Sequence, residues 1–230
     1  MNRKDHTNPV RGHRGKSSRC ALYFMCISHD GSDTLGTVLR TLGKAALSAE
    51  QRITDVRRSN DGEYIAEVYA EENMVIEDLL GCAFVACQSY ITRVVSRIQW
   101  LHQRLEHDGS CLTTTKGTRS ALLKAHSAIV PGTCFTHVEV VNAFANYYKH
   151  HEQWAAKWDR ELSQKRSISR ETINVIRASV AAEDLPHNCR KGLIALGIDR
   201  VFDVYTMADI LMRWHTDLAD AYRKELRLLE

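Results

Sequence analysis

Proline is scarce in this chain of 230 residues, where it occurs three times, as Pro9, Pro131 and Pro186. An interior proline removes a backbone donor and clashes with the preceding turn, so long stretches without proline favour helices. Alternation of apolar and polar residues, the pattern of a half-buried strand, is also rare. The composition of 44% hydrophobic and 26% charged residues provides ample apolar material for a packed core. Together these features predict an all-α fold.

The chain also lacks the motifs of several common site types. Its seven cysteines are odd in number and include no Cys-x-x-Cys pair, which argues against a disulfide framework and a zinc site. Cys82 and Cys87 fall in an apolar helical pattern and are expected to be small core residues. No glycine-rich phosphate loop and no serine-nucleophile motif are present. We therefore predict no metal, no cofactor and a location in the reducing cytoplasm.

No apolar run approaches the roughly 20 residues that span a bilayer, so no membrane association is expected. The short segment Ala21–Ile27 (ALYFMCI) lacks a following signal-peptide cleavage site, and we expect it to be the first buried segment. The net charge of +3 is too small to indicate nucleic acid as a partner. Residues 1–19, however, hold six basic side chains against one acid, Asp5. They predict a disordered basic tail, which is either only solvated or contacts phosphates.

Residues 20–230 are predicted to form a single domain, an up-and-down helical bundle of about five to seven helices. The clearest helix covers about residues 63–107, since apolar residues recur there every three or four positions. Gln88 lies on the opposite, polar face of this helix. Thr136 and Glu139 have the spacing of a capping box, which marks a helix start. The other expected helices cover about residues 35–56, 119–129, 136–162, 171–182, 188–196 and 205–229, with a polar linker at 163–170.

A polar stripe on the predicted helix 136–162 carries the residues with chemical potential. Asn146 and His150 are four residues apart and share a face, which Lys149 borders and Asn142 and Gln153 extend. An imidazole transfers protons near neutral pH, and a lysine stabilises the charge of a phosphodiester transition state. Such residues suit metal-free cleavage of RNA by its own 2′-hydroxyl. The alternative is that the stripe is the solvated face of an ordinary helix.

The pattern Asn146-x-x-x-His150 resembles part of the motif of the HEPN superfamily (higher eukaryote and prokaryote nucleotide-binding). The segment Ala145–Trp154 (ANYYKHHEQW) is also similar to an Asn-Tyr-aromatic-Lys-His segment of some uncharacterised bacterial proteins. The resemblance implies a helical bundle over residues 63–230 and a metal-independent ribonuclease of toxin–antitoxin, CRISPR or antiphage systems. It also implies a homodimer with both motifs in one cleft. In such an enzyme, His150 would be the general acid and base, Asn146 the orienting group and Lys149 the electrostatic stabiliser.

The sequence departs from the family's motif at Ala145, where the family has the arginine that is expected to hold the scissile phosphate. Lys149 does not reproduce the fork of an arginine. Three hypotheses follow. The chain is a ribonuclease that acts on RNA as a bacterial toxin or defence effector, with an antitoxin or defence protein as partner. Alternatively, it is a catalytically inactive HEPN-like module for binding, dimerisation and partner docking, or a nucleotide-binding regulator that uses Lys149 and the basic tail.

Overall fold

The computed structural model describes residues 32–58, 62–107, 112–113, 115–154, 168–180 and 188–228. Within these ranges the fold consists of seven α-helices and one 3-10 helix. The described residues contain a single β-bridge, between Ile129 and Thr136. The prediction of an all-α helical bundle is confirmed. The predicted basic tail and the segment Ala21–Ile27 lie outside the described residues.

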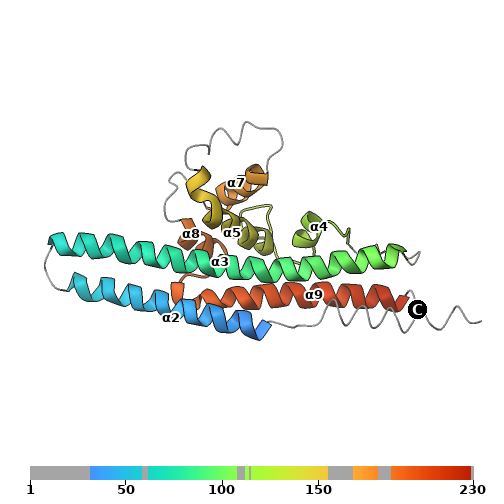
Figure 1. The fold of residues 1–230 in the computed structure, drawn as a ribbon, viewed down its shortest axis with the longest axis horizontal. Helices are drawn as coiled ribbons and strands as arrows, with labels where there is room; N and C mark the ends of the chain where they lie inside the picture. Colours follow the sequence, from blue (N-terminus) through green and yellow to red (C-terminus); the bar gives the residue numbers. More distant parts are fainter. Residues whose placement is uncertain are drawn as a thin grey trace, which may run out of the picture.

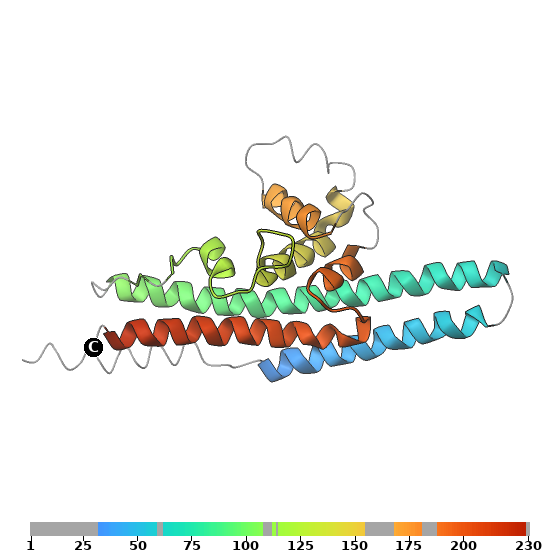
Figure 2. The same cartoon turned by 180° about the vertical axis from the view of Figure 1, so that it is seen from behind.

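The longest helix, α3 (Gly62–His107), has 46 residues and runs through the middle of the molecule. α2 (Ser32–Arg57) lies antiparallel to its first half, and α9 (Thr206–Leu228) lies along its second half (Figures 1 and 2). The 3-10 helix η1 (Val201–Tyr205) leads into α9 and contacts α2. The other helices sit on the opposite side of α3 (Figure 1). They are α4 (Arg119–Lys124), α5 (His137–Trp154), α7 (Ile168–Ser179) and α8 (Asn188–Ala195).

The apolar stripe of α3 forms the centre of the core, as the sequence predicts. Its members are all buried, because α2 and α9 cover one side of the helix and α5 covers the other. Phe84 of α3 stacks on Phe144 of α5 with ring centroids 5.3 Å apart. The helix is continuous over its whole length. The buried stripe consists of Ile76, Leu80, Ala83, Cys87, Ile91, Val94, Ile98, Leu101 and Leu105.

Length and composition alone make α3 a candidate for crossing a membrane. Within Tyr64–His107, a window of 18 residues has a mean hydropathy of 1.4, and 50% of that window is buried. The expectation that no segment reaches this length and hydropathy is therefore wrong by this criterion. The core accounts for the hydropathy, since the apolar stripe of α3 packs against α2, α5 and α9.

Several local expectations differ from the structure. Cys82 is exposed rather than buried, because it lies one position before the stripe residue Ala83. α4 ends at Lys124 rather than near residue 129, since His126 adopts a φ of 57° and Ile129 pairs with Thr136. α7 begins at Ile168, so the end of the expected linker is helical.

Two buried Tyr–His pairs join α3 to α9. Tyr90 Oη lies 2.7 Å from His215 Nδ1, and His102 Nε2 lies 2.8 Å from Tyr222 Oη. Desolvation raises the pKa of Tyr90 to about 12 and lowers the pKa of His102, because burial disfavours the charged forms. His215 is only 3% exposed, and its bond to Tyr90 offsets the cost of burying the ring.

Candidate functional site

The predicted site residues lie on α5, and a capping box fixes where this helix begins. The Thr136 backbone N–H donates to Glu139 Oε2 over 2.9 Å, and the Glu139 backbone N–H donates to Thr136 Oγ1 over 3.3 Å. These bonds confirm the predicted helix start. Phe144 and Ala145 are completely buried in the core, so the opposite side of α5 is left to form a site.

A cavity of about 650 Å³ lies along that side of α5, and α3, α4 and α7 complete its walls. This volume falls in the range of sites that hold small organic ligands. The side chains of Leu123, Phe135 and Val175 form apolar parts of the wall. The polar part is formed by Gln88 and Thr92 of α3, Arg119, Ser120 and Lys124 of α4, Glu139, Asn142, Asn146 and Lys149 of α5, and Glu171, Thr172 and Asn174 of α7.

Gln88 is the centre of a hydrogen-bond network in this wall and is only 8% exposed. Its Nε2 donates to Asn146 Oδ1 over 2.8 Å and to Asn142 Oδ1 over 3.0 Å. Its Oε1 accepts a hydrogen bond from Lys149 Nζ over 2.6 Å. The network holds an amide pair and an ammonium group at fixed positions beside the cavity.

Arg119 adds a second cation from a different helix. Its Nη2 donates to Asn142 Oδ1 over 2.9 Å. Partial burial lowers the pKa of Arg119 from its ordinary value, which is so high that the guanidinium remains protonated. Among the described residues, no carboxylate forms an ion pair with Arg119 or Lys149, whereas Glu139 already lies 3.7 Å from Lys124 Nζ. Apart from the paired Lys124 and Glu139, the described lining holds two cations, Arg119 and Lys149, against one carboxylate, Glu171, so its net charge is positive and suits an anion.

The structure brings Asn146 and Lys149 together at the cavity but does not bring His150 to the same wall. His150 is half-buried and is absent from the described residues that line the cavity. It lies about 100° from Lys149 around the helix axis, since successive residues turn by that angle. Ala145 faces the core, so an arginine at this position would point away from the cavity.

Sequence reasoning missed Gln88 and Arg119. It placed Gln88 on the solvated face of the long helix, but α5 covers this position and buries the amide. Arg119 appeared only as the start of a helix, with nothing in its surroundings to connect it to Asn142, 23 residues away. The burial of Gln88 and the contact of Arg119 with Asn142 arise only from the packing of α3, α4 and α5, so the sequence alone does not show them.

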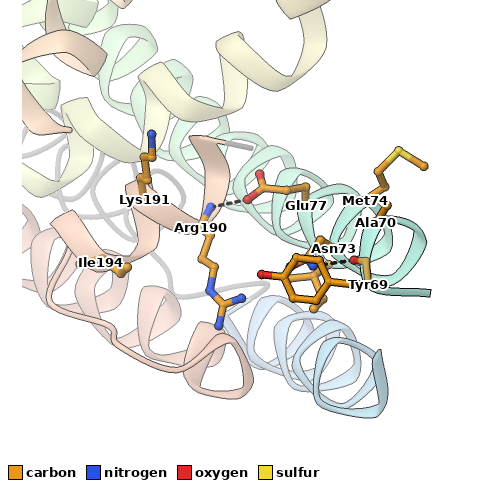
Figure 3. Close-up of a pocket in the computed structure, with 9 residues that line it drawn as sticks. Tyr69, Ala70, Asn73, Met74, Glu77, Arg190, Lys191 and Ile194 are labelled. Carbon is orange, nitrogen blue, oxygen red and sulfur yellow. Dashed lines mark hydrogen bonds between the residues drawn. The ribbon is translucent and has the colours of Figure 1, made fainter. Parts of the chain in front are cut away.

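A second cavity, of about 530 Å³, lies between the first half of α3 and α8 (Figure 3). Glu77 accepts hydrogen bonds from the backbone N–H groups of Cys189 (2.8 Å) and Arg190 (3.1 Å), which fixes the start of α8. Arg190 extends toward α2, where its Nη2 pairs with Glu50 Oε1 at 2.8 Å, while Lys191 points the opposite way (Figure 3). The cation of Arg190 is thus already compensated, and the cavity beside α5 is the better anion site.

Comparison with protein-family models, curated proteins and solved structures found no match to this chain. The fold and site therefore define the class by themselves. Over its described residues, the protein is an all-α bundle with a cavity whose polar lining includes four amide side chains and two cations, Arg119 and Lys149, that form no ion pair with a described carboxylate. The resemblance to the HEPN superfamily remains a prediction from the sequence.

Proposed function

We propose that this chain is a HEPN-like binding module whose cavity beside α5 holds a phosphate group of RNA. The observation that carries the proposal is the convergence of Lys149, Arg119 and Asn146 on one cavity, where neither cation forms an ion pair with a carboxylate of the described residues. Ammonium, guanidinium and amide N–H groups form charge-assisted hydrogen bonds to phosphate oxygens. RNA is the phosphate carrier that the Asn146–His150 resemblance suggests. Binding is favoured over catalysis because His150 does not line the cavity.

The test is the affinity of the purified chain for a fluorescently labelled single-stranded RNA, measured by anisotropy in EDTA at several salt concentrations. We expect Lys149→Ala and Arg119→Ala each to weaken binding about tenfold or more, since each removes a charge-assisted hydrogen bond. Lys44→Ala is the matched control, because Lys44 is an exposed cation of α2, and α2 and α5 lie on opposite sides of α3 (Figure 1). The proposal fails if the control weakens binding as much as Lys149→Ala, or if the wild-type chain binds no RNA.

Metal-independent RNA cleavage is the second candidate function. It is favoured by the link from Lys149 through Gln88 to Asn146, which holds two of the three predicted catalytic groups in one network. His150, four residues beyond Asn146, would then act as the general acid and base. Incubation of RNA with the protein in EDTA tests this idea, with His107→Ala as a control at an exposed histidine. Cleavage that persists unchanged in His150→Ala, or no cleavage at all, excludes it.

The quaternary structure and the location remain predictions from the resemblance and the composition. We expect a homodimer in the cytoplasm that docks an antitoxin or a defence protein. Light scattering would then give about twice the 26.1 kDa mass of one chain. A strictly monomeric chain that co-purifies with no partner would contradict the docking role.

A further inference from the structure

We infer that Gln88 is a positioning residue that orients the amides of Asn142 and Asn146, so that both present N–H donors to an anion in the cavity. The inference rests on the proposed anion-binding role of this cavity. It states that the orientation of the two asparagine amides gives the cavity its preference for an anion. It concerns a side chain that would not touch the ligand itself, since its polar atoms are already bonded to Asn142, Asn146 and Lys149.

Lys149 determines which way the Gln88 amide faces. An ammonium group has donors and no acceptor, so the atom of Gln88 that lies 2.6 Å from Lys149 Nζ must be the carbonyl oxygen. The amide nitrogen of Gln88 then faces the two asparagines. A reversed amide would place two donors against each other and leave a buried oxygen facing the asparagine oxygens, which is costly in a site that is only 8% exposed.

Gln88 in turn determines which way the asparagines face. Its Nε2 is only a donor, so the Oδ1 atoms of Asn142 and Asn146 both point at it, at 3.0 Å and 2.8 Å. Arg119 fixes Asn142 in the same sense, because its Nη2 also donates to Asn142 Oδ1. The Nδ2 atoms are left on the far side of each amide, and no described residue accepts a hydrogen bond from them.

The outcome is a wall that offers donors to the cavity. Asn142 and Asn146 line the cavity, so their Nδ2 groups are available to an occupant together with the remaining N–H groups of Lys149 and Arg119. A tetrahedral oxyanion, which carries only acceptors, satisfies such a wall. A cation or a ligand rich in donors would leave these groups unsatisfied and is disfavoured.

Gln88→Glu reverses this arrangement with almost no change of shape. A carboxylate has no donor, so the Asn146 amide is expected to rotate, donate to Glu and turn its oxygen toward the cavity, while Arg119 continues to hold Asn142. The new charge also neutralises Lys149. We expect the affinity for sulfate, a dianion over the pH range used, to fall at least about tenfold at about pH 7.5. Calorimetric titration measures it, and circular dichroism confirms the fold.

The pH dependence of sulfate binding by Gln88→Glu distinguishes an effect of the donors and charge at position 88 from an effect of side-chain packing, because protonation leaves the shape of Glu nearly unchanged. A protonated Glu is uncharged and regains one of the two donors of the Gln it replaces, so the difference in sulfate affinity between wild type and variant should narrow without closing as the pH falls to about 4.5, where part of the Glu is protonated. Asn146→Asp is the second variant, because an aspartate still accepts from Gln88 but replaces the donor Nδ2 by an oxygen. Asn146→Asp should also lose at least about tenfold in sulfate affinity. This variant tests the inference if Gln88→Glu does not fold.

The outcomes distinguish this inference from the proposed function. Sulfate binding that depends on Gln88, in a chain that binds no RNA, supports the positioning role and overturns the RNA proposal. RNA and sulfate affinities that are unchanged in folded Gln88→Glu and in Asn146→Asp overturn the positioning role and leave the RNA proposal standing. A wild-type chain that binds neither sulfate nor RNA overturns both.

Discussion

Among the glycines in the described part of the chain, Gly81 of α3 has the closest neighbour to an added Cβ. A Cβ added there would lie 2.0 Å from Cδ2 of Tyr148, well inside van der Waals contact. The ring of Tyr148 is held by its hydroxyl, which donates to Asp78 Oδ1 over 3.2 Å. Desolvation also raises the pKa of this hydroxyl above its usual range, so the group stays a neutral donor. The close approach of α5 to α3 therefore requires a glycine.

We expect Gly81→Ala to lower the free energy of unfolding by about 1–3 kcal/mol, the usual cost of overpacking. Gly36 of α2 provides the matched control, since a Cβ there would meet only the side chain of Arg40, at 3.4 Å. Gly36→Ala should stabilise the protein by up to about 1 kcal/mol through helix propensity. Urea unfolding of both variants checks the pair, and equal effects would contradict the packing of α5 on α3.

Between elements, the contact of α3 with α9 contains a titratable group whose charge opposes folding. Desolvation lowers the pKa of His102, and the carboxylates of Glu106 and Glu225 only partly offset this effect. The unfolded chain therefore binds a proton at a higher pH than the folded chain does. Stability from this group is complete above the unfolded pKa of about 6.5 and is lost as the pH falls below that value.

We expect the free energy of unfolding to fall on acidification below about pH 6.5, by at most about 1.4 kcal/mol per pH unit for this one proton. His102→Gln keeps a polar group that can hydrogen-bond Tyr222 but does not titrate, so its stability should fall less steeply over the same range. Burial also lowers the pKa of His137, which remains in both proteins and cancels in the comparison. Parallel stability curves for wild type and His102→Gln would contradict a depressed pKa for His102.

For the molecule as a whole, the composition of α3 and its packing point to different environments. A window of 18 residues in the helix has a hydropathy that would permit a membrane span, yet the apolar stripe is already covered by α2, α5 and α9. Exposed arginines on its other faces, Arg93 and Arg104 among them, would be costly in lipid. We expect α3 to act as a core helix in water.

The measurement is flotation of the purified full chain with phosphatidylcholine vesicles. The protein should remain in the dense fraction, because insertion of α3 would first require loss of its contacts with three helices.

Leu80→Asp should lower the stability of the protein in water, because it removes a buried apolar group and buries a charge. A wild-type chain that floats with the vesicles would show that the packing of α3 does not hold its apolar stripe in place.

The sequence by itself determined the helical class, the extent of α3 and the capping box of α5. These depend on residues three or four positions apart, which the helix repeat places together whatever surrounds them. It also identified Asn146 and Lys149 as neighbours, because they are close on one helix.

Tertiary packing decided which polar residues are enclosed. Gln88 lies on the predicted polar face of its helix, but α5 covers it. Arg119 reaches the cavity only because α4 packs beside α5, and His150 does not line it. The helix repeat predicts the direction in which a side chain points from its own helix axis. The helix that packs against that side chain comes from a distant part of the chain. This tertiary contact determines the burial, the hydrogen bonds and the pKa of the side chain.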